Sequence, residues 1–543
     1  MQFSIALDSA KLPGSSAGEW TRFDSKSVVS LHIQSPTESL QGQKLLGRAK
    51  FNTFRSMTCS VMEDAMMADF QSIPLRPAAP VSHESLLQFP EDPVECMRQL
   101  HRRHGDIAVM EQESQRLAFV FSPELNRQVL TDSNSFHSRF FAVRGSRKSA
   151  QRRVTSGLLS QNGAEHRDTR RILKDVFSKK VLPGYHPTIC RLTEDLLKDW
   201  HPGSERDLNV EMVQFMLRMT SALLFGLDDA GFAHELGHMI DRWVHQNHEV
   251  GMGALVSGPQ FNSKYDELLE MADELENSIQ TLFHKHRNQQ HEMPNVLSLL
   301  FHAQASSQQL SDEKLTGHAT LLFAAAHLTT AHTFSWTLFL LAQHPEIMQR
   351  VSGEVAEHVH GERPTIEELD RLEFLEHVIK ESMRVLPASA YSQRIVAEPV
   401  TLNGIRLSPG TPVVFSQYIT HHRPDLFESP DEFQPDWWKT ISPSPYEYLP
   451  FGAGPRMCIG APLAMAEIKT ALALILKRCR LQMTANATVN GQVISTMLGP
   501  TSPIRAKVIA AGEETHTVPV HGSIHDLVRL PIEAMPQQQR RAA

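Results

Sequence analysis

Residues 451–460 read Phe451-Gly452-Ala453-Gly454-Pro455-Arg456-Met457-Cys458-Ile459-Gly460, and a helix is expected directly after them, over residues 461–478. The partial positive charge at the N-terminus of a helix lowers the pKa of a nearby thiol, which favours the thiolate form of Cys458. The glycines let the backbone turn tightly and direct N–H groups at the sulfur. Arg456 offers a guanidinium that suits a carboxylate. The pattern favours a metal-binding thiolate over the alternative, a buried free cysteine in a glycine-rich loop.

The spacing Phe-x-x-Gly-x-Arg-x-Cys-x-Gly resembles the cysteine-ligand signature of the cytochrome P450 family. The resemblance implies that Cys458 is the axial ligand to the iron of haem b, that Phe451 packs beside the porphyrin, and that Arg456 binds a propionate. An axial thiolate donates electron density to the iron and favours cleavage of an O–O bond. The implied fold is mainly α-helical with small β-sheets, and the haem lies between a central buried helix and the cysteine loop.

Two segments upstream resemble other parts of this family that surround the haem. Glu381 and Arg384 are similar to its E-x-x-R pair on one helix face, although such a pair by itself is usually a solvated surface pair. Arg394 follows where the family has an arginine that binds a propionate. His166 and Arg170, one helical turn apart, resemble its H-x-x-x-R and would reach the same propionate; a basic helix face in water explains them equally well.

Residues 321–343 are apolar on nearly every face, which indicates either a helix buried in a large protein or a membrane span. Histidines and threonines interrupt the segment and no anchor pattern flanks it, so we expect a buried core helix. The segment resembles the family's central I helix. Thr329 then lies where that helix has the threonine that assists oxygen activation and proton relay; the alternative is a helix threonine bonded to its own backbone.

The chain departs from the family's pattern at two places. In the central helix, where the family has A/G-G-x-acid-T, Leu328 replaces the acid and Ala326 replaces the glycine. His327 is a conceivable substitute for the acid, although a histidine there is expected to face packing partners. Trp437 stands where the family often has an arginine beside its E-x-x-R pair, so that pair is either two-membered or completed by another group.

Length and composition predict one large domain with two tails. The chain has 543 residues, 41% of them hydrophobic, and a net charge of −8, which gives no indication of nucleic-acid binding. We expect the haem-thiolate oxygenase domain over residues 70–510, a weakly patterned, disordered extension over residues 1–69 and a polar, loosely attached tail over residues 511–543. The extension has no long apolar run, so no membrane anchor is expected. Met66 or Met67 is a candidate translation start.

The cysteines indicate a reducing environment. The chain has five of them, and no two form a C-x-x-C pair. This pattern argues against a disulfide framework and against a zinc site. A cytoplasmic location is therefore expected.

Between the tails the sequence predicts mostly helices with short strands. Hairpins are expected for residues 107–110 with 117–121, and around Asn403-Gly404 and Asn490-Gly491, because Asn-Gly is a strong turn signal. The longest patterned stretches predict helices over residues 190–200, 210–223, 232–246, 264–287 and 344–358.

The resemblance implies an O₂-dependent monooxygenase that acts on a hydrophobic small molecule. The chain shows no dinucleotide-binding glycine motif and no ferredoxin cysteine cluster, so a ferredoxin- or flavodoxin-type protein is expected to supply electrons. Five basic residues form either a docking surface for that partner or an ordinary solvated helix face. They are Arg167, Arg171, Lys174, Lys179 and Lys180.

Two other functions fit the same sequence. One is a peroxide-driven or isomerase-like haem-thiolate enzyme, for which the missing acid matters less; the other is a non-catalytic haem-binding protein. Candidate cavity walls are small or apolar, which favours a hydrophobic ligand, although each could equally be part of the core. They are Ala325, Leu328, residues 388–390, the loop 140–154, and Met497-Leu498.

Overall fold

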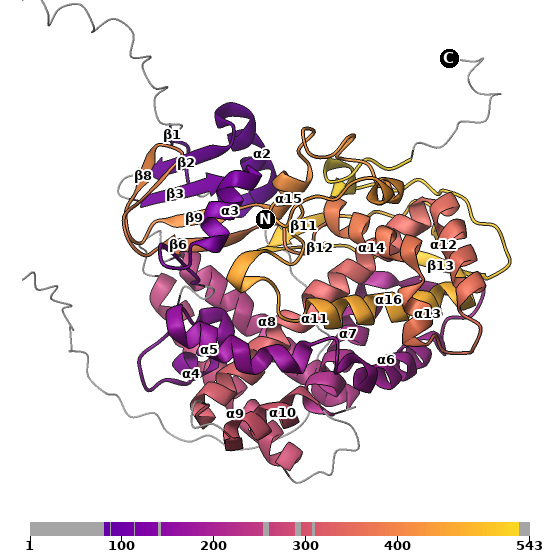
Figure 1. Ribbon diagram of the computed structural model, residues 1–543, viewed down its shortest axis with the longest axis horizontal. Coiled ribbons are helices and arrows are strands. Elements are labelled where there is room, and N and C mark those ends of the chain that lie inside the picture. Colours follow the sequence, from indigo (N-terminus) through magenta and orange to yellow (C-terminus); the bar gives the residue numbers. More distant parts are fainter. Residues whose placement is uncertain are drawn as a thin grey trace, which may run out of the picture. The chain divides into compact units, whose positions relative to one another are not determined.

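Helix α11 (Asp312–Gln343) forms the centre of the fold (Figure 1). The computed structural model describes residues 81–531 apart from 87, 113–114, 140–142, 228, 254–259, 288–294 and 307–309. These residues belong to one unit, Leu75–Ala543. The expected N-terminal extension, with its candidate translation start, lies outside the described residues. The hydroxyl of Ser311 accepts a hydrogen bond from the Lys314 N–H and so caps the start of α11.

Helices surround α11 on several sides, and the short ones connect them to the strands. The five helices predicted from the sequence correspond to α6, α7, α8, α9 and α12, with ends that differ by some residues. Helix α6 begins earlier than predicted: Pro183 stands in its first turn, where proline is tolerated, and the helix also contains Pro187. The helices are α1 (Gln88–Glu91), α2 (Pro93–His104), α3 (Pro123–Thr131), α4 (Ala150–Val154), η1 (Leu158–Ser160), α5 (Gly163–Lys174), η2 (Asp175–Phe177), α6 (Leu182–Leu197), α7 (Leu208–Phe225), α8 (Ala230–Gly253), α9 (Gln260–Arg287), α10 (Val296–Ser306), α12 (Pro345–His358), α13 (Ile366–Asp370), α14 (Glu373–Val385), α15 (Gln417–His421), η3 (Pro435–Lys439), η4 (Gly454–Arg456), α16 (Ala461–Arg478) and η5 (Ser523–Asp526).

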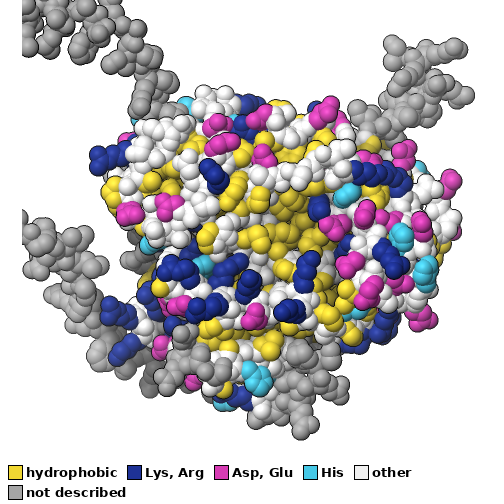
Figure 2. Space-filling view, in the orientation of Figure 1, with side chains coloured by type: hydrophobic (Ala, Val, Ile, Leu, Met, Phe, Trp, Pro, Cys, Tyr) yellow, Lys and Arg dark blue, Asp and Glu magenta, His cyan; other side chains and the backbone are white. Residues whose placement is uncertain are grey.

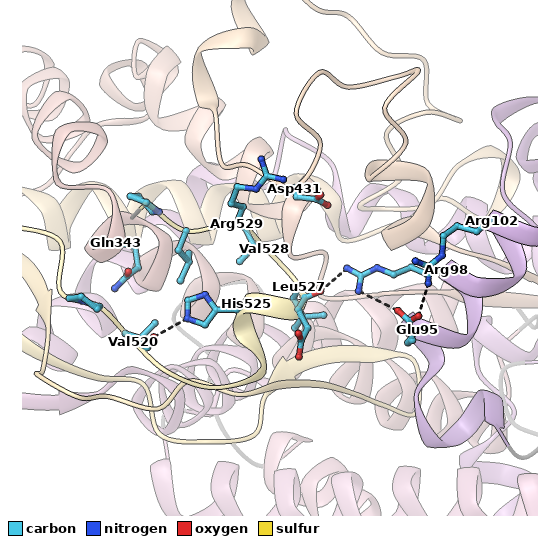
Figure 3. Close-up of a pocket in the computed structure, with 14 residues that line it drawn as sticks. Glu95, Arg98, Arg102, Gln343, Asp431, Val520, His525, Leu527, Val528 and Arg529 are labelled. Atoms are coloured by element: carbon cyan, nitrogen blue, oxygen red, sulfur yellow. Dashed lines mark hydrogen bonds and ion pairs between the residues drawn. The ribbon is translucent and has the colours of Figure 1, made fainter. Parts of the chain in front are cut away.

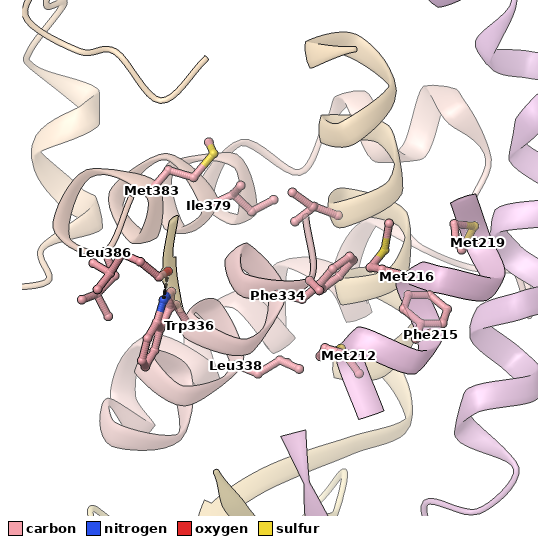
Figure 4. Close-up of a cluster of buried hydrophobic side chains, with 14 of the residues drawn as sticks. Met212, Phe215, Met216, Met219, Phe334, Trp336, Leu338, Ile379, Met383 and Leu386 are labelled. Atoms are coloured by element: carbon pink, nitrogen blue, oxygen red, sulfur yellow. Dashed lines mark hydrogen bonds between the residues drawn. The ribbon is translucent and has the colours of Figure 1, made fainter. Parts of the chain in front are cut away.

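The core lies where α7 and α14 cover α11. From Thr330 to its end, α11 is almost entirely buried, apart from the half-buried His332. Phe334 of α11 meets Phe215 of α7 edge to face, with ring centroids 5.8 Å apart, and methionines of α7 lie beside them (Figure 4). Burying each such side chain contributes about 1.5–3 kcal/mol. The prediction of a buried core helix is confirmed.

No single helix in the described part of the chain is long and apolar enough to cross a membrane. Helices α7 and α8 meet that test only as a pair, with an angle of 99° between them. Helix α11 fails it, although it was the candidate span in the sequence. Its C-terminal half is instead covered by protein.

The largest sheet of the described residues has six strands in the order β1-β2-β3-β9-β6-β4, and it lies at one side of the helices (Figure 1). Three smaller sheets pair β10-β13-β5, β11-β12 and β7-β8. Mainly α-helical architecture with small sheets is therefore confirmed. The strands are β1 (Val81–Ser82), β2 (Ile107–Gln112), β3 (Gln115–Val120), β4 (Phe136–His137), β5 (Glu205–Asp207), β6 (Ser392–Val396), β7 (Val400–Leu402), β8 (Ile405–Leu407), β9 (Pro412–Phe415), β10 (Cys479–Met483), β11 (Gly491–Ile494), β12 (Met497–Pro500) and β13 (Arg505–Ala510).

Two of the three predicted hairpins form as expected. Strands β2 and β3 pair antiparallel, and β7 and β8 turn at Asn403-Gly404, where both φ angles are positive. The turn predicted at Asn490-Gly491 is wrong, because the hairpin β11–β12 turns at residues 495–496. Gly491 begins β11 instead, and a Cβ there would lie 2.6 Å from the Leu527 side chain. Glycine serves close packing at this position rather than a turn.

The C-terminal segment 512–531 packs against the domain, so the prediction of a loose tail is wrong for these residues; residues 532–543 lie outside the described chain. Ile524, Leu527 and Val528 are buried. The Tyr418 hydroxyl donates to the Leu527 carbonyl at 2.7 Å, and Arg98 of α2 donates to the Asp526 carbonyl at 2.7 Å. Between this segment and α2 runs a groove of about 700 Å³ (Figure 3). The segment is polar on average, but its few apolar side chains are buried and anchor it.

Replacing Ile524 by alanine should lower the free energy of unfolding by about 2–4 kcal/mol, because Ile524 is fully buried and its loss leaves a cavity. Urea unfolding of the purified protein measures the change. Glu514→Ala, an exposed position of the same segment, is the matched control and should change stability by less than about 0.5 kcal/mol. Equal effects of the two substitutions would contradict the anchoring of this segment.

Candidate active site

The cysteine loop leads from η4 directly into α16, as the sequence predicted. The Cys458 N–H donates to the Phe451 carbonyl at 2.8 Å and closes the loop. Gly454 has a φ of 71°, and a Cβ there would lie 2.4 Å from the Leu130 carbonyl oxygen. Glycine is required at this close approach. The loop thereby holds Cys458 just before the N-terminus of α16.

The Cys458 side chain is exposed to solvent on one side, and protein atoms lie close around the rest of it. This burial raises the pKa of the thiol, and the N–H groups of Gly460 and Ala461 and the charge of Arg170 act against it. A bound metal ion deprotonates a thiol outright. The described residues contain no group of three His, Cys, Asp or Glu side chains that could hold a metal. Cys458 therefore suits a metal whose other ligands belong to a cofactor.

Three arginines and a histidine converge beside this loop. His166 and Arg170 come from α5, Arg394 from β6 and Arg456 from η4. Burial and then the charge of Arg456 lower the pKa of Arg394 to about 10, and burial and then Arg170 lower that of Arg456 to about 10. Burial and the nearby arginines lower the pKa of His166 to about 4. Like charges held together in this way favour an anionic ligand.

The three arginines of this cluster find only neutral acceptors in the described chain. Arg170 donates to the Met457 carbonyl at 2.6 Å, and Arg456 donates to the side-chain oxygen of Asn162 at 2.6 Å. Arg394 donates to the neighbouring carbonyl of residue 393. Their charges are free for carboxylates of a ligand, and guanidinium groups suit carboxylates. The residues present therefore fit a haem whose propionates face this cluster, with Cys458 as the protein ligand.

Phe451 is half-buried against the hydrophobic core at the start of the loop. Its carbonyl receives the Cys458 N–H, so its position and that of the sulfur are linked. The contact of the Phe451 ring with a porphyrin stays a prediction. Asn162, which fixes Arg456, was missed by the sequence analysis, because nothing in the sequence relates it to a residue almost three hundred positions away.

One face of α11 is open in the middle of an otherwise buried helix. Ala325 is exposed, and Leu328 and Thr329 are partly exposed. The Thr329 hydroxyl donates to the Ala325 carbonyl at 2.9 Å, and Thr333 donates in the same way to the Thr329 carbonyl. Such bonds tend to bend a helix. Thr329 is thus bonded to its own backbone, as the alternative interpretation expected, and its oxygen retains lone pairs on the open face.

His327 faces away from this opening. It is fully buried, and its Nε2 lies 2.9 Å from a carboxylate oxygen of Asp241 on α8. Its Nδ1 lies 2.9 Å from the Phe323 carbonyl. Both ring nitrogens therefore lie within hydrogen-bond distance of oxygen atoms. The histidine serves packing between α8 and α11, as its expected orientation indicated, and it does not replace the acid missing at Leu328.

The Glu381–Arg384 pair is fully buried and bidentate, with N–O distances of 2.9 and 2.8 Å. The indole N–H of Trp438 and the backbone N–H of Gln434 each donate to a Glu381 oxygen at 2.9 Å. Arg384 donates to the carbonyls of residues 421, 430 and 432. Among the described residues no further base completes the pair; neutral donors and acceptors do so instead. The ring of Trp437 lies against the Arg384 guanidinium, with 5.1 Å from its centre to the central carbon.

Two predicted cavity walls lie side by side. The Leu498 N–H donates to the Ala388 carbonyl at 3.0 Å, and Ser389 forms a bridge with Met497. Residues 388–390 and 497–498 are thus one wall, although a hundred residues separate them in the sequence. Leu498 and Ala390 are fully buried, so these two belong to the core rather than to the surface of an opening.

Comparison with known proteins agrees with this arrangement. The profile of the family "Cytochrome P450" matches residues 77–508. A "Cyclooctat-9-en-7-ol 5-monooxygenase" of Streptomyces melanosporofaciens is 28% identical over 71% of this chain and 84% of its own length. A "Pentalenene oxygenase" of Streptomyces avermitilis is 26% identical over 73% of this chain and 89% of its own length. The solved structure "Retinoic acid bound cyanobacterial CYP120A1" has the same fold, with a TM-score of 0.67 and 21% identity over 80% of this chain and 99% of that chain.

Proposed function

We propose a substrate class and an electron source for this chain, which belongs to the cytochrome P450 family and is a monooxygenase. It inserts one oxygen atom of O₂ into a hydrophobic small molecule, with haem b as cofactor and electrons from a separate ferredoxin- or flavodoxin-type protein. When bound, a thiolate-ligated haem supplies the oxygen chemistry. Cys458 holds the cofactor, and His166, Arg170, Arg394 and Arg456 bind its propionates. The free cysteines of the described chain suit a cytoplasmic location.

The open face of α11 is the observation that carries the substrate class. Its exposed and half-exposed side chains from Ala325 to Leu328 are mostly small or apolar, which is typical of a site for a hydrophobic ligand. Two relatives are named for oxidation of cyclooctat-9-en-7-ol and for oxidation of pentalenene, which makes these compounds the first substrates to test.

Turnover under two conditions tests the reaction. The holoenzyme is incubated with substrate candidates and either NADPH with surrogate ferredoxin and reductase under O₂, or hydrogen peroxide alone. We expect product only, or mainly, in the first condition, with one atom of oxygen from ¹⁸O₂ in the product. Product formed with peroxide alone, and none with NADPH and O₂, would instead favour a peroxide-driven enzyme, for which the missing acid at Leu328 would be no handicap.

Thr329 is proposed to steer protons at the open face of α11. Replacing it by alanine should lower the product formed per NADPH consumed by about tenfold or more, since a positioned proton-transfer group contributes about 10²–10⁴-fold. The electrons then appear as hydrogen peroxide, which is measured together with product and NADPH. Thr329→Ser keeps the hydroxyl and should restore most of the coupling. If Thr329→Ala forms as much product per NADPH as the wild type, Thr329 has no role in proton transfer and only bonds to the helix backbone.

The electron donor is proposed to dock on the basic surface around α5. Arg167, Arg171, Lys174, Lys179 and Lys180 are all exposed, and Lys and Arg side chains gather over this part of the molecule (Figure 2). Such a surface attracts an acidic partner through long-range charge. It lies on the same side as the Cys458 loop, because Arg170 of α5 contacts the Met457 carbonyl.

Reversing the charge of Lys179 and Lys180 to glutamate should raise the ferredoxin concentration needed for half-maximal turnover by about tenfold at low salt. The difference from wild type should shrink as salt is added, because screening removes it. Peroxide-supported turnover, if any, should stay unchanged, since it needs no partner. An unaltered ferredoxin dependence would indicate an ordinary solvated helix face.

A further inference from the structure

The segment between Asp132 and Glu165 contains six Lys and Arg residues and no acidic residue, although the whole chain has a net charge of −8. Among the described residues, Arg153 forms the one ion pair of this segment, with Glu276 of α9 at 2.5 Å. A positive segment without internal counter-charge attracts anions. The other five basic residues are Arg139, Arg144, Arg147, Lys148 and Arg152.

Helix α4 of this basic segment packs against α9 and α11, and its Gln151 side chain contacts α8. The Gln151 side chain donates to the Val143 carbonyl at 2.8 Å and accepts from the indole N–H of Trp243 on α8 at 2.8 Å. On the other side, Gly157 is so close to Gly317 of α11 that a Cβ would lie 2.4 Å from its carbonyl oxygen. Gly317 precedes the open position Ala325 by eight residues, about 12 Å along a helix. The contact of this segment with α11 therefore lies about 12 Å before the open position, measured along the helix axis.

Arg144 is a half-buried member of the segment that, like Arg152, has no carboxylate partner among the described residues. Its Nη2 donates to the Ser160 carbonyl at 2.9 Å. Ser160 is only 4% exposed, and its hydroxyl has no hydrogen-bond partner. Buried hydroxyl groups are rarely left unpartnered. The Arg144 guanidinium has further N–H groups to donate, and the Ser160 hydroxyl is buried without a partner. Together these two residues offer a set of donors that suits an anion.

This donor set consists of residues other than the arginines beside the cysteine loop. Burial lowers the pKa of Arg144, followed by the charge of Arg152, while Glu165 raises it and Arg139 lowers it further. The two groups lie close together in the fold, because Arg456 donates to the carbonyl of Gln161 and Arg144 donates to the carbonyl of the preceding residue, Ser160. The site thus borders the haem-binding region.

We propose that Arg144 binds a carboxylate of the substrate, with the Ser160 hydroxyl as a second donor, so that the substrate is an amphipathic carboxylic acid. Its hydrocarbon part lies along the face of α11 that carries Ala325 and Thr329. The planar guanidinium donates two parallel hydrogen bonds to a carboxylate, and the charges of Arg139 and Arg152 add attraction. This inference rests on the proposed oxygenase function and specifies its substrate class.

Optical titration of the holoenzyme with matched pairs of ligands tests the proposal. Each pair consists of a carboxylic acid and the primary alcohol of the same skeleton, and the skeletons are linear, monocyclic and aromatic; substrate binding is followed by the shift of the haem absorbance. We expect at least one acid to bind about tenfold or more tightly than its alcohol, because a hydrogen bond to a charged group is worth that factor. Arg144→Gln should remove the difference, whereas the exposed Arg147→Gln should keep it.

Three outcomes would overturn the proposal: equal binding of acids and alcohols by the wild type in every pair, an undiminished preference in Arg144→Gln, or loss of haem from Arg144→Gln that Arg144→Lys restores. The last would assign the guanidinium to a haem propionate. Should Arg144→Gln fail to fold, Ser160→Ala replaces it, since it keeps every charge and should reduce the preference several-fold. NADPH-driven oxygenation of neutral compounds is measured in parallel, and its presence or absence judges the oxygenase function independently of the acid preference.

Discussion

Replacing Cys458 by alanine is expected to abolish the red-shifted absorbance band of the reduced carbonyl complex, together with all NADPH-driven product formation. The band depends on a thiolate bound to the iron, and the described residues contain no group of side chains that could take over as a metal site. The arginines beside the loop remain in the variant and can still hold the propionates of a haem. We therefore expect a coloured protein with an unshifted band rather than a colourless one.

Cys96→Ala is the matched control for this experiment. Cys96 is also a cysteine with a free thiol, but it is buried in α2, where its sulfur contacts that of Met110. The control should keep the shifted band and its activity. A shifted band of normal intensity in Cys458→Ala would show that another group ligates the iron, and the proposed site would then be wrong.

Replacing Glu381 by glutamine should destabilise the protein by about 3–5 kcal/mol, because it leaves the charge of Arg384 buried without its counter-charge. The loss is a large part of the stability of a typical protein, which is about 5–15 kcal/mol. We expect most of the variant to be insoluble when expressed, and the soluble remainder to unfold at much lower urea concentration, followed by circular dichroism.

Lys198→Gln provides the comparison for this substitution. Lys198 pairs with Asp195 across one helical turn at 2.7 Å, and its side chain is 73% exposed. An exposed pair of this kind contributes about 0–1 kcal/mol, so the control should remain soluble and stable. A loss of less than 1 kcal/mol in Glu381→Gln would contradict the importance of the buried pair. The predicted difference between the two variants comes from burial alone, because both remove one charge of an ion pair.

The local parts of the site could be predicted from the sequence because they depend on short spacings. The glycines around Cys458 and the apolar pattern of residues 461–478 indicated a loop followed by a helix, and α16 has these bounds. Apolar residues on every face of the segment 321–343 indicated a buried helix, and α11 is buried along its C-terminal half. The Asn-Gly pattern was a less reliable predictor of hairpin turns, since Asn403-Gly404 turns a hairpin and Asn490-Gly491 does not.

Other features depend on residues that meet only when the chain is folded. Trp438 and Gln434 complete the surroundings of Glu381 from fifty residues away, and a tryptophan in place of the expected arginine gave no sign of this. The C-terminal segment appeared loose because its few apolar residues are scattered among polar ones, yet Ile524 and Leu527 fit into the core. Composition averages over a segment, whereas packing depends on a few side chains.

The sequence by itself determined the cysteine loop, the central helix and the residue types beside that loop, because helix periodicity, turn geometry and motif spacing act over a few residues. The tertiary structure decided which of these residues converge. It brought His166, Arg394 and Arg456 from three distant segments to one place and left Arg144 and Ser160 as a separate set of donors. Packing between distant segments sets these positions against the repulsion between the arginines, and no local pattern of residues encodes them.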